Sequence, residues 1–282
     1  KSSLLRWFIG TMIVLTRTKK AKSHYEEIGG RSPLLGLTEK LAAKLSSLRD
    51  QNVYIVMRYV PPFASEVIKQ MMDDGVEEIV LFPMYPQYST TTTKSSLEDF
   101  HATAIKMGFH PKVHTVENFY KNREINTLIV EKIIETLSGE EAGEYDIVFS
   151  AHSLPQKIID AGDEYERQVE EHTEILQNML YMQGANFRKA HLAYQSKLGP
   201  VKWLGPSLEE MLHKISQTNK KVVIYPISFT VDNVETVYEL GIEYEEVAKK
   251  FGFESYKVVS CPNDDEDFAR ALSEIIDEKM ES

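Results

Sequence analysis

His152 is the residue whose position most directly suggests chemistry, because it follows a run that is typical of a buried strand. Residues 145–150 form a largely apolar run that is rich in bulky side chains, and Gly143 and Pro155 bound it. In open α/β sheets, ligands bind in the crevice beyond the carboxyl ends of the strands. A neutral imidazole there suits proton abstraction or metal handling. The alternative is a loop histidine, or a helix cap with Ser153 starting the next helix.

A row of carboxylates forms a second candidate constellation. Asp232, Glu235, Glu239 and Glu243 advance by three and four residues, so on an α-helix they would share one face, opposite apolar residues such as Val237. Carboxylates that enter a cleft in a row repel one another, so some should carry protons or bind a cation. Oxygen and imidazole ligands together suit a divalent transition ion. The alternative is an amphipathic helix that exposes its acids to water.

The elements that must position these residues alternate along the chain. Short apolar runs predict strands at residues 53–59, 78–82, 112–116, 146–150, 190–194, 221–227 and 256–260. Longer amphipathic runs predict helices near residues 63–73, 93–107, 121–138, 163–184, 207–217, 233–251 and 265–280. This alternation indicates an α/β fold with mainly parallel sheets.

The two halves of the chain follow a similar plan. Residues 74–84 and 218–227 each contain a helix end, a turn, an apolar strand and a proline before a polar loop. We therefore expect two similar lobes, each a mainly parallel sheet flanked by helices, with a cleft between them, where ligand sites are common. A polar link near residues 139–144 divides an N-terminal lobe (1–141) from a C-terminal lobe (142–282) that carries the histidine and the acidic helix. The alternative is that doubly wound folds look self-similar without duplication.

The composition of the chain limits the classes of binding partner and cofactor that it could have. The chain has 282 residues, and 32 Lys and Arg against 43 Asp and Glu give a net charge of −11, which disfavours nucleic acid. Cys261 is the only cysteine, so no disulfide or cysteine-ligated iron–sulfur cluster forms within the chain. A cytoplasmic location fits this cysteine usage. The protein is also predicted to be a monomer. Residues 4–15 are apolar but too short to cross a bilayer, so we expect a helix over a cleft or in peripheral contact with a membrane.

Five motifs resemble those of the ferrochelatase family and keep its order over essentially the whole chain. They are residues 25–34 (YEEIGGRSPL), 82–89 (FPMYPQYS), 150–155 (SAHSLP), 195–206 (QSKLGPVKWLGP) and 228–236 (SFTVDNVET). The resemblance implies a two-lobed chelatase-like fold that inserts ferrous iron into protoporphyrin IX to form haem. Ferrous iron is then a substrate, and no permanently bound cofactor is expected.

The resemblance also implies roles for individual residues. His152 matches the essential histidine and Glu235 the acid that faces it across the cleft, and the division of proton and metal handling between them stays open. Asp232, Glu239 and Glu243 match an acidic row that carries protons outward or metal inward. The positions that match the porphyrin cleft or its rim are Tyr25, Arg17, Lys20, Arg58, Tyr59, Tyr88, Ser95, Tyr165 and Trp203. Arg17 and Lys20 could pair with the porphyrin propionates.

Two alternatives share this resemblance. The first is the same fold acting on another tetrapyrrole or metal, such as coproporphyrin with iron or a corrin precursor with cobalt. The second is a non-catalytic porphyrin or metal carrier. Family members open with a strand and a Gly-rich loop ahead of the first helix, and this sequence begins at about that helix. The N-terminal lobe is therefore expected to lack its first strand.

Overall fold

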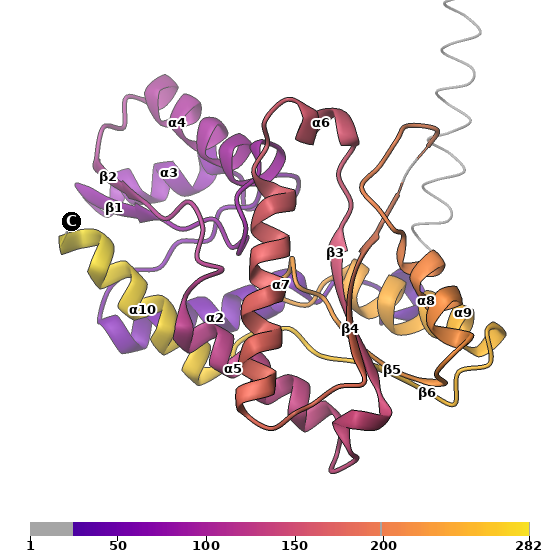
Figure 1. Cartoon of the computed structure of the whole chain (residues 1–282). Coiled ribbons are helices and arrows are strands. Elements are labelled where there is room, and N and C mark those ends of the chain that lie inside the picture. Colours follow the sequence, from indigo (N-terminus) through magenta and orange to yellow (C-terminus); the bar gives the residue numbers. More distant parts are fainter. Residues whose placement is uncertain (1–24, 198, 282) are drawn as a thin grey trace, which may run out of the picture.

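In the computed structural model, which describes residues 25–197 and 199–281, the chain folds around two parallel sheets (Figure 1). The smaller sheet pairs β1 (Glu78–Leu81) with β2 (Lys112–Thr115). The larger sheet has the order β4-β3-β5-β6, and its strands are β3 (Asp146–His152), β4 (Lys189–Gln195), β5 (Lys221–Tyr225) and β6 (Ser255–Val258). Every neighbouring pair is parallel, so the α/β fold class predicted from the sequence is confirmed.

Helices flank both sheets, and six of the seven predicted helical stretches agree with the structure within a few residues. The α-helices are α2 (Leu34–Arg49), α3 (Ala64–Asp73), α4 (Ser95–Met107), α5 (Arg123–Thr136), α6 (Gln156–Asp160), α7 (Tyr165–Met182), α8 (Leu208–Ser216), α9 (Tyr244–Lys250) and α10 (Glu266–Glu281). Two π-helices, η1 (Thr90–Lys94) and η3 (Glu235–Glu243), and a 3-10 turn, η2 (Ala142–Glu144), complete the described elements. The seventh stretch, residues 233–251, divides into η3 and α9.

The predicted strand at residues 53–59 is wrong. Among the described residues this run joins neither sheet, and β1 pairs only with β2. Its backbone instead enters a tight loop, in which the Met57 N–H donates to the Pro62 carbonyl oxygen over 2.8 Å. An apolar run becomes a strand only where a neighbouring strand accepts and donates its backbone hydrogen bonds.

Strand β3 lies at the centre of the hydrophobic core. Successive side chains of a strand point to opposite faces of the sheet, and here both faces are fully buried. Ile147 and Phe149 pack among residues of α5, α7 and α10, whereas Val148 packs among residues of α8 and η3. Burial on both faces explains why residues 147–149, in the middle of the strand, are a continuous apolar run in the sequence.

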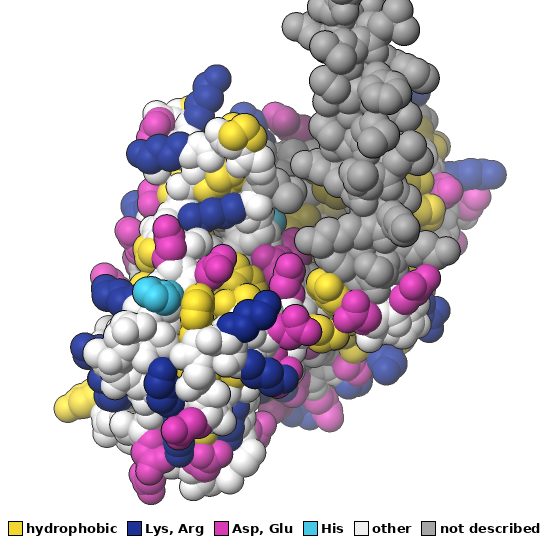
Figure 2. Space-filling view, turned by 90° about the vertical axis from the view of Figure 1, so that its right-hand side faces the viewer, with side chains coloured by type: hydrophobic (Ala, Val, Ile, Leu, Met, Phe, Trp, Pro, Cys, Tyr) yellow, Lys and Arg dark blue, Asp and Glu magenta, His cyan; other side chains and the backbone are white. Residues whose placement is uncertain are grey.

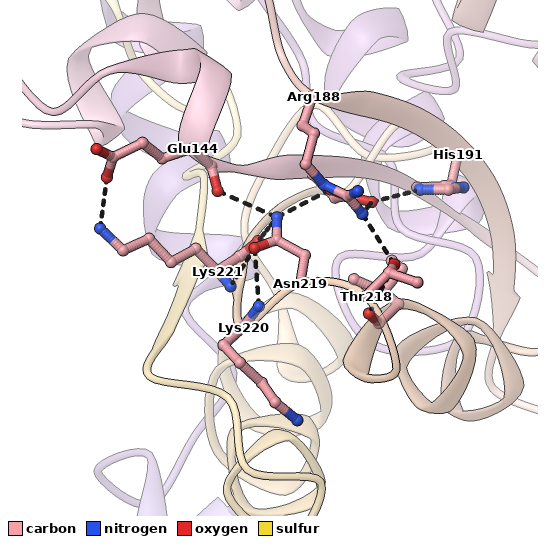
Figure 3. Close-up of polar contacts among 9 residues, drawn as sticks. Glu144, Arg188, His191, Thr218, Asn219, Lys220 and Lys221 are labelled. Carbon is pink, nitrogen blue, oxygen red and sulfur yellow. Dashed lines mark hydrogen bonds and ion pairs between the residues drawn. The ribbon is translucent and has the colours of Figure 1, made fainter.

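A polar cluster fixes the opposite, amino-terminal edge of this sheet. The buried carboxylate of Asp146 accepts hydrogen bonds from Arg188 Nε (2.5 Å) and Nη2 (3.0 Å), His191 Nε2 (2.9 Å) and Asn219 Nδ2 (2.9 Å). Arg188 also donates to Thr218 Oγ1 over 3.0 Å. Figure 3 shows Arg188, His191 and Asn219 converging from different segments. This cluster therefore joins β3, β4 and the turn before β5.

The last helix returns to the first half of the chain. α10 packs against α2 and α5, and its residues Phe268 and Leu272 share one core with β3 (Figure 1). In the described part of the chain, no helix combines the length and the apolar character needed to span a membrane.

Candidate active site

His152 is the last residue of β3, at the carboxyl edge of the larger sheet. The register places it beside Gln195, the last residue of β4. The loop after β5 closes over the same edge, because the Ile227 N–H donates to the Ser150 carbonyl oxygen over 3.1 Å. The Phe229 ring from that loop stands edge-on to the His152 ring, with 6.5 Å between their centres. The loop then leads directly into η3.

The structure brings His152 and Glu235 into direct contact, although 83 residues separate them in the sequence. His152 Nδ1 lies 2.7 Å from Glu235 Oε2, and the two side chains remain 37% and 33% exposed. The second ring nitrogen, Nε2, makes no hydrogen bond with the residues that the structure describes. A histidine held through Nδ1 by a carboxylate therefore presents Nε2 to an incoming ligand.

The two side chains shift each other's pKa values in opposite directions. Burial lowers the pKa of His152, but the hydrogen bond to Glu235 and the charges of Glu235 and Glu239 outweigh it, so the pKa of His152 is raised. Burial raises the pKa of Glu235, but the hydrogen bond and charge of His152, assisted by Ser196, outweigh it, so the pKa of Glu235 is lowered. The pair therefore favours a proton on the imidazole and a charged carboxylate.

Glu235 starts a π-helix rather than the expected α-helix. The turn before it is capped locally, because Glu235 N–H donates to Asn233 Oδ1 (2.8 Å) and Asn233 N–H donates to Thr236 Oγ1 (2.9 Å). Over the nine residues of η3, each turn is wider than in an α-helix. The wider turn changes which residues lie on the buried face of the helix. Val237, which is expected on that face, is 36% exposed. π-Helical turns often occur at functional sites.

The predicted acidic row is only partly assembled. Glu239 lies next to Glu235, because both carboxylates contact the Ser196 hydroxyl, and Glu243 is exposed at the far end of η3. Asp232 precedes the helix and faces another loop, where its carboxylate accepts hydrogen bonds from Asn263 Nδ2 (2.7 Å) and the Cys261 N–H (3.4 Å). On the face that Figure 2 shows, acidic side chains gather around hydrophobic ones.

Glu239 holds a proton more readily than a free glutamate does. Burial raises its pKa, hydrogen bonds from Ser196 lower it, and the charges of Glu235 and Glu243 raise it again, so the net shift is upward. Glu235 and Glu239 are thus neighbouring acids with opposite pKa shifts. Within the described residues, no group of three or more His, Cys, Asp and Glu side chains could hold a metal ion.

Comparison with known proteins identifies the family. The ferrochelatase family model matches residues 1–280. The chain belongs to the ferrochelatase family. A ferrochelatase from Nitratiruptor sp. is 52% identical over 98% of this chain and 88% of the relative, and one from Sulfurimonas denitrificans is 49% identical over 98% and 87%.

Solved structures support the same fold. "SirB from Bacillus subtilis with Fe3+" aligns with a TM-score of 0.60 over 86% of this chain and 88% of that chain, at 12% identity. "The structure of CbiX, the terminal Enzyme for Biosynthesis of Siroheme in Denitrifying Bacteria" aligns with a TM-score of 0.57 over 84% and 88%, also at 12% identity. The ferrochelatase chain therefore has a chelatase-like fold.

The structure places the predicted porphyrin-binding residues at several depths. Tyr59 is 79% exposed, and the Arg58 guanidinium lies 5.5 Å from the centre of its ring while pairing with Asp99 over 3.3 Å. Tyr25 is 38% exposed. Trp203 is half-buried, and its indole nitrogen has no partner among the described residues. Arg17 and Lys20 lie outside the described residues.

Tyr88 and Ser95 flank the π-helix η1 of the first half. The Tyr88 N–H donates to Gln168 Oε1 over 2.8 Å, and the Ser95 hydroxyl donates to the Thr91 carbonyl oxygen over 2.9 Å. Asp163, which lies two residues before α7, holds this loop in place. Its carboxylate accepts hydrogen bonds from the Thr90 N–H (2.7 Å) and from the Ser89 hydroxyl (3.0 Å). Asp163 was not singled out in the sequence, where it is one acid among many.

Tyr165 does not line an open surface but holds the backbone of His152 through its hydroxyl. It is buried, and its hydroxyl lies 2.8 Å from the His152 carbonyl oxygen and 2.7 Å from Ser228 Oγ. Burial raises its pKa far above the usual value, so the hydroxyl keeps its proton. Ser228 in turn accepts from the His152 N–H over 3.3 Å. Tyr165 and Ser228 thus hold the His152 backbone at the end of β3.

Replacing Tyr165 with Phe is expected to lower the free energy of unfolding by about 1–3 kcal/mol, because buried polar groups lose a partner. We expect metal insertion to slow and porphyrin binding to persist, since the His152 backbone loses one of its fixed points. Urea unfolding and steady-state insertion measure the two effects. Tyr181→Phe is the control, because Tyr181 lies on the same helix and is 74% exposed. Equal stability of both variants would contradict this role.

Proposed function

We propose that this chain inserts ferrous iron into protoporphyrin IX to form haem, with release of two protons, and that His152 and Glu235 carry the step. Membership of the ferrochelatase family supports the reaction class. The 2.7 Å contact between His152 Nδ1 and Glu235 Oε2 is the single observation that supports the residues. An aromatic macrocycle hides its nitrogens and loses two pyrrole protons as the metal enters, so a base must stand near its centre.

The opposite pKa shifts suggest how the two residues divide the work. His152, with its raised pKa, accepts a pyrrole proton through Nε2 once the imidazole is neutral. Glu235, with its lowered pKa, stays charged and attracts the ferrous ion. The same carboxylate stabilises the imidazolium that forms when His152 takes the proton.

The remaining acids extend this pair. We propose that Glu239 and Glu243 carry protons away from the His152–Glu235 pair or iron towards it, and the upward pKa shift of Glu239 supports a proton-carrying role. The contact of Asp232 with Asn263 supports a role for Asp232 outside this route.

The porphyrin is proposed to lie over this edge of the sheet, against the side chains that the family resemblance implies. Tyr25, Arg58, Tyr59, Tyr88, Ser95, Tyr165 and Trp203 would line or support the cleft, and Arg17 and Lys20 would pair with propionates. Cytoplasmic location, a monomeric state and the lack of an iron–sulfur cluster stay predictions, as does membrane contact through residues 4–15, which lie outside the described residues. Cys261, the only cysteine, is buried.

Substrate preference is tested by comparing steady-state insertion of ferrous iron or zinc into protoporphyrin IX and into coproporphyrin. The loss of porphyrin fluorescence measures the rate of insertion. We expect kcat/KM to be at least about tenfold higher for protoporphyrin IX, because burying the additional charged propionates of coproporphyrin costs free energy unless further cations pair with them. Faster insertion into coproporphyrin, or into a corrin precursor with cobalt, would contradict the proposed substrate. Tight porphyrin binding without any insertion would indicate a carrier.

A further inference from the structure

Ser196 joins the two acids nearest to His152. It directly follows β4, one residue beyond the Gln195 that pairs with His152 in the sheet. Its N–H donates to Glu239 Oε1 over 2.9 Å. Its hydroxyl oxygen lies 2.9 Å from Glu235 Oε2 and 2.6 Å from Glu239 Oε2. One small residue thus contacts both carboxylates, and it touches Glu235 at the same oxygen that faces His152.

The backbone of Ser196 is strained. Its φ is 64°, in the left-handed region that residues other than glycine rarely adopt. Asp50 and Ser138 also have positive φ, but each directly follows or caps a helix end, where this conformation is common. Ser196 instead follows a strand. A strained residue persists where its surroundings hold it in place, and such residues cluster at functional sites.

Both observations have one explanation. Glu235 and Glu239 lie four residues apart on η3, and their like charges would drive them apart. Hydrogen-bond donors between them reduce that repulsion and fix their spacing. We propose that Ser196 is a positioning residue, which holds Glu235 against His152 and keeps Glu239 beside it for metal insertion. This inference rests on the proposed function, because it assigns Ser196 to the same pair.

The hydroxyl and the backbone can be separated by substitution. Ser196→Gly keeps the N–H and adopts φ 64° freely, so we expect its stability to equal or exceed that of the original chain. Because this variant lacks the hydroxyl, we expect its kcat/KM for zinc or ferrous iron to fall about 10- to 100-fold. This is the effect expected when a charged group loses one hydrogen bond. Ser196→Ala should lose the same activity but be less stable than Ser196→Gly. Protoporphyrin affinity, measured by fluorescence, should stay unchanged in both.

Ser138→Gly is the matched control, because Ser138 also has a positive φ of 54° but lies just beyond α5. It should retain full insertion. A second test combines Ser196→Gly with Glu239→Gln: if Ser196 acts through these acids, the combined loss of kcat/KM is smaller than the product of the two single losses. Full activity of Ser196→Gly, or multiplicative losses, would overturn the role of Ser196. No insertion by the original chain and by Ser138→Gly would instead overturn the proposed function.

Discussion

Replacement of His152 by Ala is expected to abolish metal insertion while porphyrin binding persists. The imidazole Nε2 is the proposed acceptor of a pyrrole proton, and loss of a positioned general base costs about 10²- to 10⁴-fold in rate. Glu235 would also lose its partner at 2.7 Å. Steady-state insertion of ferrous iron and zinc measures the loss, and fluorescence titration with protoporphyrin IX measures the binding.

His101→Ala is the control for this variant, because His101 is exposed on α4 and no catalytic role is assigned to it. It should insert metal as the original chain does. Retained turnover in His152→Ala would reject the assignment of His152, and lost porphyrin binding would mean that the side chain shapes the cleft instead.

The position of His152 could be predicted from the sequence because β3 is buried on both faces. A strand of this kind is a continuous apolar run, and its carboxyl end is where ligands of α/β sheets bind. The contact with Glu235 could not be derived from local pattern, since it depends on how the loop after β5 folds over the edge of the sheet. Only the family resemblance pointed to it.

Other features could not be predicted from the sequence, and the structure shows why. The spacing of Asp232, Glu235 and Glu239 fits an α-helix, yet the helix begins only at Glu235 and its first nine residues are π-helical. Asp232 therefore lies before the helix and faces Asn263. α2 was missed because Pro33 stands at its N-cap, where no side chain caps the helix, and its first turn has no acid. The left-handed conformation of Ser196 arises from tertiary contacts, which a serine in a motif does not reveal.

Replacement of Asp146 by Ala is expected to have the largest effect on stability. Its buried carboxylate accepts four hydrogen bonds, two from Arg188 and one each from His191 and Asn219. Removal of one member of a buried ionic cluster leaves the other charge without a partner, which costs about 3–5 kcal/mol of unfolding free energy. Urea unfolding at neutral pH measures this loss.

The effect of Asp146→Ala should depend on pH. Burial raises the pKa of Asp146, but the hydrogen bonds from His191, Arg188 and Asn219 outweigh it, so the pKa is lower in the folded state than in the unfolded state. The carboxylate therefore contributes its full stability above the unfolded pKa of about 3.9, and the contribution is lost as the pH falls through the folded pKa. The difference between the original chain and the variant should thus be greatest near pH 7 and shrink below about pH 4.

A neighbouring exposed pair supplies the contrast for this prediction. Lys221 Nζ lies 2.6 Å from Glu144 Oε2 at the same edge of the sheet, but the two side chains are 30% and 56% exposed (Figure 3). Because water screens such a pair, Glu144→Ala should cost much less stability than Asp146→Ala. Equal losses for Glu144→Ala and Asp146→Ala would mean that burial does not set the strength of this cluster. The large loss at Asp146 alone would show that this edge depends on one buried carboxylate, far from the His152 edge where the chemistry is proposed.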